Sequence, residues 1–260
     1  MITHLTRYPV KGLSGEALEA LQLIAGEGIA GDRAVAIARE AGVFDPGAPE
    51  AKSKMHFLML AKDEALAALD TRFDADTQTL IVRQSDGPAF AASIATEAGR
   101  AEIARFFKIY LGKDGLEPQV VSAAGHKFTD ISVVSAEKMR AVSLVNLASV
   151  RALEDATGRK IDPRRFRANI CFDGAPAWDE LNWVDRNVQI GAASARVVKR
   201  TKRCPATDVN PDTAARDMNL PTEIRKHFGH FDMGIYAEIE TSGEVTIRDS
   251  VKLFDQTHAT

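Results

Sequence analysis

Residues 200–211 read Arg-Thr-Lys-Arg-Cys-Pro-Ala-Thr-Asp-Val-Asn-Pro and place one cysteine, Cys204, between a cationic cluster and a proline. Residues 194–199, just before, are typical of a strand, and residues 208–212, just after, are rich in turn-forming types. Arg200, Lys202 and Arg203 lie beside the thiol, and cations favour the thiolate form that attacks electrophiles and binds metals. A lone cysteine of this kind is more often an inert thiol beside solvated charges. The stretch therefore predicts a reactive cysteine only if other parts of the chain support it.

Length and composition are those of an ordinary globular chain. It has 260 residues, 45% hydrophobic and 27% charged, so we expect one large or two modest domains with a sizeable core. The net charge, 33 − 36 = −3, argues against binding nucleic acid in bulk. No apolar run approaches the roughly 18 residues of a membrane helix, and residues 1–9 lack the apolar core of a signal peptide. We therefore expect a cytoplasmic protein with no membrane or nucleic-acid partner.

The expected elements are many short strands and few helices. Residues 66–73 and 79–83 flank a turn-forming segment and predict a hairpin, while apolar spacing predicts helices over 96–110 and 146–158. Residues 166–172 predict a strand that would place Arg167, Asn169 and Cys171 on one face. This pattern favours a mainly β, α+β fold with a closed or partly closed β structure over a doubly wound sheet.

Six cations are expected at turn tips or strand edges. Each one alone is more often a surface charge, but together they could build an anion pocket beside Cys204, with Arg suited to bidentate phosphate contact and Lys to a point charge. The ligand of such a pocket would carry a phosphate. The six residues are Lys11, Arg33, Arg165, Arg167, Lys202 and Arg203.

The other candidate motifs are weak. The glycines of residues 26–31 fit neither the Walker A pattern nor the dinucleotide fingerprint. His227 and His230 lie three residues apart without a third ligand, so a solvated or capping role is preferred, and Asp179 with Glu180 is read as surface charge. No Cys-x-x-Cys motif is present, which disfavours a zinc ribbon or an iron–sulfur cluster, and the two cysteines suit a reducing compartment.

Several segments, taken in order, resemble MOSC-domain proteins. Residues 165–170 resemble the FRxN strand of that family, and residues 202–207 and 229–236 resemble its Lys-Arg-Cys-Pro-Ala-Thr and Gly-His-Phe-Asp-Met-Gly-Ile-Tyr segments. Residues 8–12, Tyr-Pro-Val-Lys-Gly, and 31–33, Gly-Asp-Arg, resemble the β-barrel domain that precedes MOSC in many members. The resemblance implies a smaller N-terminal β-barrel-like domain over residues 1–95 and a β-barrel-like MOSC domain over 96–260.

The resemblance also implies a chemistry. Such proteins carry a molybdenum cofactor, and Cys204 would be its metal ligand and the catalytic residue. Likeness to amidoxime-reducing members places Lys11, Arg33, Ser149, Arg167 and Asn169 at cofactor contacts, and the cations Arg165, Lys202 and Arg203 join them as expected cofactor-binding residues. The implied reaction is reduction of an N–O bond in a small N-hydroxylated substrate. Electrons would come from an external ferredoxin-like protein or a cytochrome or flavin reductase, because this chain lacks the cysteines of an iron–sulfur cluster.

Two points remain open in the sequence. Gly12 stands where amidoxime-reducing relatives can have Ser, and Lys202 stands where some have a small polar residue. In addition, an exposed thiol serves equally well in a module that carries the cofactor, or a persulfide on Cys204, to a partner without turnover.

Overall fold

An eight-stranded sheet dominates the structure, a computed structural model that describes residues 1–85 and 87–254. The strand order is β16-β12-β13-β14-β10-β11-β1-β2, and every neighbouring pair is antiparallel except β10 with β11. The strands are β1 (Ile2–Arg7), β2 (Glu16–Leu18), β10 (Val142–Asn146), β11 (Ile170–Phe172), β12 (Asn187–Ile190), β13 (Ala193–Lys202), β14 (Asp232–Thr241) and β16 (Val251–Phe254).

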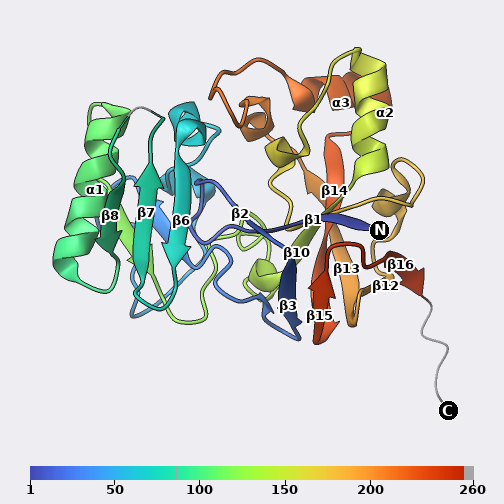
Figure 1. Ribbon diagram of the computed structural model, residues 1–260, viewed down its shortest axis with the longest axis horizontal. Coiled ribbons are helices and arrows are strands. Elements are labelled where there is room, and N and C mark those ends of the chain that lie inside the picture. Colours follow the sequence, from blue (N-terminus) through green and yellow to red (C-terminus); the bar gives the residue numbers. More distant parts are fainter. Residues whose placement is uncertain (86, 255–260) are drawn as a thin grey trace.

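The inner face of this sheet forms the largest apolar core. Residues such as Leu144, Ile170, Val197 and Ile235 are fully buried there, because alternate side chains of a strand point to the same face. A small second sheet covers this core in the order β15-β3-β4, made of β3 (Ala20–Ile24), β4 (Gly28–Ile29) and β15 (Gly243–Thr246). The large sheet curls around this apolar core (Figure 1).

A second region, on the left of Figure 1, has its own core around Ile103 and Phe107. Thr96 caps its helix by accepting a hydrogen bond from the Gly99 amide at 3.1 Å, so the predicted helix over 96–110 is confirmed within a residue at each end. The predicted hairpin is confirmed as a strand pair, although its first strand begins only at Asp70. The elements are β5 (Val35–Ala38), β6 (Asp70–Asp74), β7 (Thr79–Arg83), β8 (Phe90–Ser93), α1 (Glu97–Leu111) and β9 (Gln119–Ser122).

The two regions are interleaved along the chain. The first strands, β1 and β2, belong to the large sheet, whereas α1 and β9 pack in the second region with β5 to β8. A division at residue 95 stays a prediction, and in space elements from both sides of it contribute to each region. The mainly β, α+β prediction is confirmed.

Helices α2 (Leu147–Thr157) and α3 (Leu220–Phe228) lie together over one end of the large sheet (Figure 1). Asn146 caps α2 at its start, and Gly158 ends it with a left-handed φ of 66°, as predicted. No described helix is both long and apolar enough to cross a membrane. Six short 3₁₀ turns complete the described elements: η1 (Lys54–His56), η2 (Glu64–Ala68), η3 (Glu137–Arg140), η4 (Pro163–Phe166), η5 (Asp179–Asn182) and η6 (Pro205–Asp208).

The predicted strand over 166–172 is wrong in its first half. Asp162 accepts a hydrogen bond from the Arg164 amide at 2.8 Å and Pro163 follows it, so the chain enters the turn η4 instead of a strand. Arg167 then adopts a left-handed conformation with φ of 50°, and strand geometry begins only at Ile170. Arg167 therefore does not share a strand face with Cys171.

Candidate functional site

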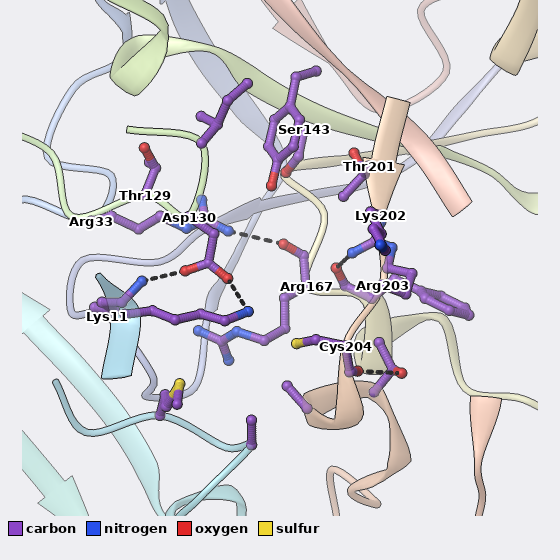
Figure 2. A pocket seen from close by; sticks show the side chains of 18 of the residues that line it. Lys11, Arg33, Thr129, Asp130, Ser143, Arg167, Thr201, Lys202, Arg203 and Cys204 are labelled. Atoms are coloured by element: carbon purple, nitrogen blue, oxygen red, sulfur yellow. Dashed lines mark hydrogen bonds and ion pairs between the residues drawn. The ribbon is translucent and has the colours of Figure 1, made fainter. Parts of the chain in front are cut away.

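A cleft of ≈ 300 Å³ lies where the end of β13 and the η4–β11 connection meet loops from the second region. Figure 2 shows Lys11, Asp130, Arg167 and Cys204 with side chains that face one another in it. The structure brings eight of the nine predicted site residues to this cleft, and Ser149 alone is elsewhere. The eight are Lys11, Arg33, Arg165, Arg167, Asn169, Lys202, Arg203 and Cys204.

Cys204 stands at the junction of β13 and the turn η6. Its backbone is extended, and its carbonyl oxygen accepts hydrogen bonds from the Thr207 amide at 3.1 Å and the Thr207 hydroxyl at 3.0 Å. The thiol is half-exposed. Cys171, by contrast, is buried, and burial raises the pKa of its thiol to about 12. Only Cys204 is therefore placed to react or to bind a ligand in the cleft.

Arg165 and Arg203 are structural cations. All three guanidinium nitrogens of Arg203 donate to backbone carbonyls, those of Met233 and Phe166, at 2.5–2.8 Å. Arg165 is buried and donates to the Thr207 and Asp208 carbonyls, with an ion pair to Asp217 at 2.6 Å. Both side chains hold the segment around Cys204 in place, so they position the thiol and do not offer charge to a ligand.

Asn169 and Arg33 form a second buried framework. The Asn169 amide donates to the Thr6 carbonyl at 3.1 Å and to Asp32 at 2.9 Å, and its oxygen accepts from Ser143 and from Arg33. Arg33 also pairs with Asp32 at 2.5 Å and donates to the Arg167 carbonyl at 3.0 Å. Asn169 is 1% exposed, and its side-chain amide and oxygen are both fully hydrogen-bonded to protein groups.

Arg167 is a cation of the cleft that no described residue neutralises. Its guanidinium lies 4.4 Å above the ring of Tyr8, which also receives the guanidinium of Arg33 at 4.7 Å. Within residues 1–85 and 87–254 its side chain has no hydrogen-bond acceptor and no ion pair. Burial lowers the pKa of this side chain, although an arginine stays charged. An anionic ligand would supply the missing acceptor.

Asp130 and Lys54 are site residues that the sequence reasoning missed. The Asp130 carboxylate pairs with Lys11 at 2.5 Å and with Lys54 at 3.2 Å, and its side chain is 44% exposed at the cleft. Burial acts to raise the pKa of Asp130, but the two lysines hold it well below its usual range. Burial likewise acts to lower the pKa of Lys54, but Asp130 and the neighbouring Cys204 outweigh this effect and raise it. Asp130 ends a polar stretch, residues 125–130, which is only a faint signal of a site, and no motif surrounds Lys54.

Two further features of the cleft bear on ligand binding. The hydroxyl of Thr201 is buried at the cleft and has no hydrogen-bond partner among the described residues. Gly12 has φ of +82°, and a Cβ there would lie 2.5 Å from the Leu58 carbonyl oxygen. Glycine is therefore required at this position, because both the conformation and the space exclude a side chain.

A protein-family model for the MOSC domain matches residues 130–252. Residues 130–252 are a MOSC domain. A 143-residue segment is 31% identical to the molybdenum cofactor sulfurase of Drosophila persimilis and covers 52% of this chain but 17% of that protein. A 121-residue segment is 29% identical to the mitochondrial amidoxime-reducing component 1 of Mus musculus and covers 42% of this chain and 35% of that protein. The matched segments thus span about a third or less of these relatives.

Among solved structures, the YUAD protein of Bacillus subtilis is similar over 96% of this chain and 94% of that chain. The identity is 14% and the TM-score 0.42.

The cleft lies at the border of the MOSC domain and the residues that precede it. The MOSC domain supplies Asp130, Arg167 and Cys204, and the preceding residues supply Lys11 and Lys54. The site is therefore built by both parts of the chain, and neither part alone holds all of its charges.

Ser149 lies in the MOSC domain, but it does not line this cleft. It is fully buried, donates to both carboxylate oxygens of Glu180 at 2.8 and 2.9 Å, and accepts from the Trp178 amide at 2.8 Å. Glu180 is also fully buried, so its prediction as surface charge is wrong, and burial raises the pKa of its carboxyl. Both residues belong to the packing of the α2 start.

The histidines have local partners. His227 pairs with Glu223 at 3.2 Å, and His230 faces the Trp178 ring at 5.3 Å. Nowhere in the described ranges do three or more His, Cys, Asp or Glu side chains gather as a metal site would require.

Proposed function

We propose that this protein is an oxidoreductase that uses a molybdenum cofactor to reduce N-hydroxylated compounds with electrons from a separate protein. The observation that carries the proposal is the pairing of the half-exposed Cys204 thiol with the unpartnered Arg167 guanidinium in one cationic cleft. A thiol at one end and a free cation beside it suit a ligand that has a soft metal and an anionic tail.

The donor set fits such a cofactor. Cys204 is a soft donor without further His, Cys, Asp or Glu partners among the described residues, so a metal bound there would bring its other ligands with it. Arg167, Lys11 and Lys54 supply positive charge for a phosphate, and the buried Thr201 hydroxyl lacks the partner that a polar ligand would give it. These five residues would hold the cofactor.

When bound, the cofactor would supply the two-electron redox chemistry, in which an N–O bond takes up two electrons and two protons and releases water. The chain's own residues do the rest. Arg165 and Arg203 fix the turn that carries Cys204. Lys54 stays protonated beside the thiol, because its pKa is raised, and Asp130 orients it through their ion pair. Lys54 is thus placed to donate a hydrogen bond at the reacting end of the cleft.

Similarity supports the proposal. The amidoxime-reducing component of Mus musculus is a reductase by its name, and its match to this chain includes 42% of the residues. The structure adds that predicted contact residues from both halves of the chain converge on one cleft.

The test is molybdenum content and turnover in protein made in a cofactor-competent host. We expect near-stoichiometric molybdenum in the wild type and in the control Cys171→Ala, and loss of metal in Cys204→Ser with an unchanged circular dichroism spectrum. The loaded protein should reduce benzamidoxime with a reduced viologen dye. Metal retained by Cys204→Ser, or loaded wild type without turnover, would contradict the proposal.

A carrier without turnover is the second candidate, and the exposure of Cys204 favours it. Such a module would hold the cofactor, or a persulfide on Cys204, for a partner. The molybdenum cofactor sulfurase of Drosophila persimilis is a matched relative by sequence. Incubation with a persulfide donor, which transfers its outer sulfur to the Cys204 thiol and leaves as a thiol, followed by intact-mass measurement would show one added sulfur atom on the wild type and none on Cys204→Ser, with no reduction of benzamidoxime.

A further inference from the structure

A shallow hollow beside the cleft is lined by four cations, which we name the basic face: Lys138, Lys199, Arg200 and Lys202. They come from η3 and from the end of β13. Apolar side chains line the same hollow, namely Val134, Leu181, Val184 and Val198, and one carboxylate, Asp232, lies among the described lining residues.

The charge of the basic face is not neutralised within the described chain. Lys138 and Lys199 have no ion-pair partner there, Arg200 donates to the Leu181 carbonyl, and Lys202 lies 5.3 Å above the ring of the exposed Phe231. Several cations elsewhere on the surface pair with carboxylates. Examples are Arg7–Glu16, Arg151–Asp173, Arg164–Asp162 and Arg216–Glu64. The basic face thus gathers four cations beside one carboxylate in a chain of net charge −3.

The basic face adjoins the reactive end of the cleft. Four residues line both the hollow and the cleft: Val134, Lys199, Arg200 and Lys202. Lys202 is two residues from Cys204, so their Cα atoms are at most about 7 Å apart. Because electron transfer slows steeply with distance, a donor protein has to bind close to the centre it reduces.

We propose that the basic face docks an acidic electron-donor protein. This inference rests on the proposed function and adds where the donor binds and which charge it carries. A hollow lined by both apolar and charged side chains suits a protein–protein interface. Interfaces of redox partners are small and transient, and opposite charges speed their formation. The apolar lining residues favour a protein over a nucleic acid, which would need cations along its whole track.

Binding is tested first on the metal-free protein, so that the result does not depend on activity. The probe is an acidic plant-type [2Fe–2S] ferredoxin, and a basic cytochrome c is the charge control. We expect Lys138→Glu/Lys199→Glu to weaken ferredoxin binding about tenfold or more at low ionic strength. The control Arg105→Glu/Lys160→Glu changes the net charge equally on exposed sites outside the hollow and should bind as the wild type does. Wild-type binding should weaken as salt rises from 10 to 150 mM, because screening shortens the Debye length from about 30 to 8 Å.

Turnover of the loaded protein provides the second readout. The ratio of the ferredoxin-driven rate to the viologen-driven rate should fall in the basic-face variant and stay constant in the control, and this ratio cancels any effect on the cleft itself. Equal ferredoxin affinity in both double variants would overturn the docking proposal, as would tighter binding of a single-stranded oligonucleotide or of cytochrome c. Failure of the viologen-driven reaction would instead contradict the proposed function, while the binding result would still stand.

Discussion

The roles assigned to Asn169 and Arg167 predict a large loss of stability on substitution of the first and little change on substitution of the second. Both line the same cleft, yet Asn169 makes five hydrogen bonds to protein groups, to Thr6, Asp32, Ser143 (two) and Arg33. At about 0.5–1.5 kcal/mol net for each bond, and with Asp32 retaining the Tyr8 amide, Asn169→Ala should lower the free energy of unfolding by about 3–4 kcal/mol. For a chain of this size that corresponds to a fall in Tm of about 10 °C.

Arg167→Met should behave differently. The substitution removes an unpartnered, half-buried charge, which relieves its desolvation, and it also removes the contact with Tyr8, which is worth about 1 kcal/mol. The two effects oppose each other, so we expect the metal-free variant to unfold within about 1 kcal/mol of the wild type. Cofactor content should be lost in both variants.

Urea denaturation of the metal-free proteins, followed by fluorescence, separates the two roles. The reasoning is refuted if Asn169→Ala unfolds within 1 kcal/mol of the wild type, or if Arg167→Met is the less stable of the two. Either result would mean that the hydrogen bonds drawn around Asn169 do not hold the framework together.

Three more substitutions test local features. Gly12→Ala should cost about 2–4 kcal/mol in a denaturation curve, because a left-handed conformation and a clash with the Leu58 carbonyl add; an unchanged midpoint would contradict the close approach. Glu180→Gln should flatten the pH dependence of stability: the raised pKa makes the wild type lose stability as pH rises above the ordinary glutamate value of about 4.3, and an amide has no such loss. Asp130→Asn should tighten binding of inorganic phosphate, measured by calorimetry, because Lys11 and Lys54 lose their internal counter-ion; equal or weaker binding would count against a phosphate site there.

Much of the fold followed from short-range signals. Thr96 and Gly158 set helix ends that a reader of the sequence can locate, since capping depends on residues only a few positions away. The interleaving of the two regions could not be predicted from such short-range signals. The pairing of β1 with β11 joins residues that are 168 positions apart in the sequence, as in the Thr3 to Cys171 hydrogen bond. The strand expected at 166–172 failed where Asp162 and Pro163 started a turn, a local signal that outweighed the alternation after it.

The site shows the same limit. Resemblance located Cys204 and most of the cleft, but residue type could not separate Arg167 from Arg165 and Arg203, which differ only in whether backbone carbonyls already occupy their guanidinium groups. Lys54 has no motif around it, and only the folded chain brings it to the thiol. Ser149 was predicted from the resemblance to the family, yet its hydroxyl donates to Glu180, because it is buried at the start of α2 and does not reach the cleft.

The position of β1 beside β11 has a consequence for how the chain is made. The first strand can pair early with β2, but the neighbour on its other edge, β11, is absent until residue 170 has been synthesised, which takes on the order of 10–30 s at about 5–20 residues per second. During that time Ile2 and Leu5, which end in the main core, are exposed to solvent and to other nascent chains. We therefore expect the N-terminal segment to need a chaperone on the ribosome, and the cysteine cleft to form only late, when synthesis is nearly complete.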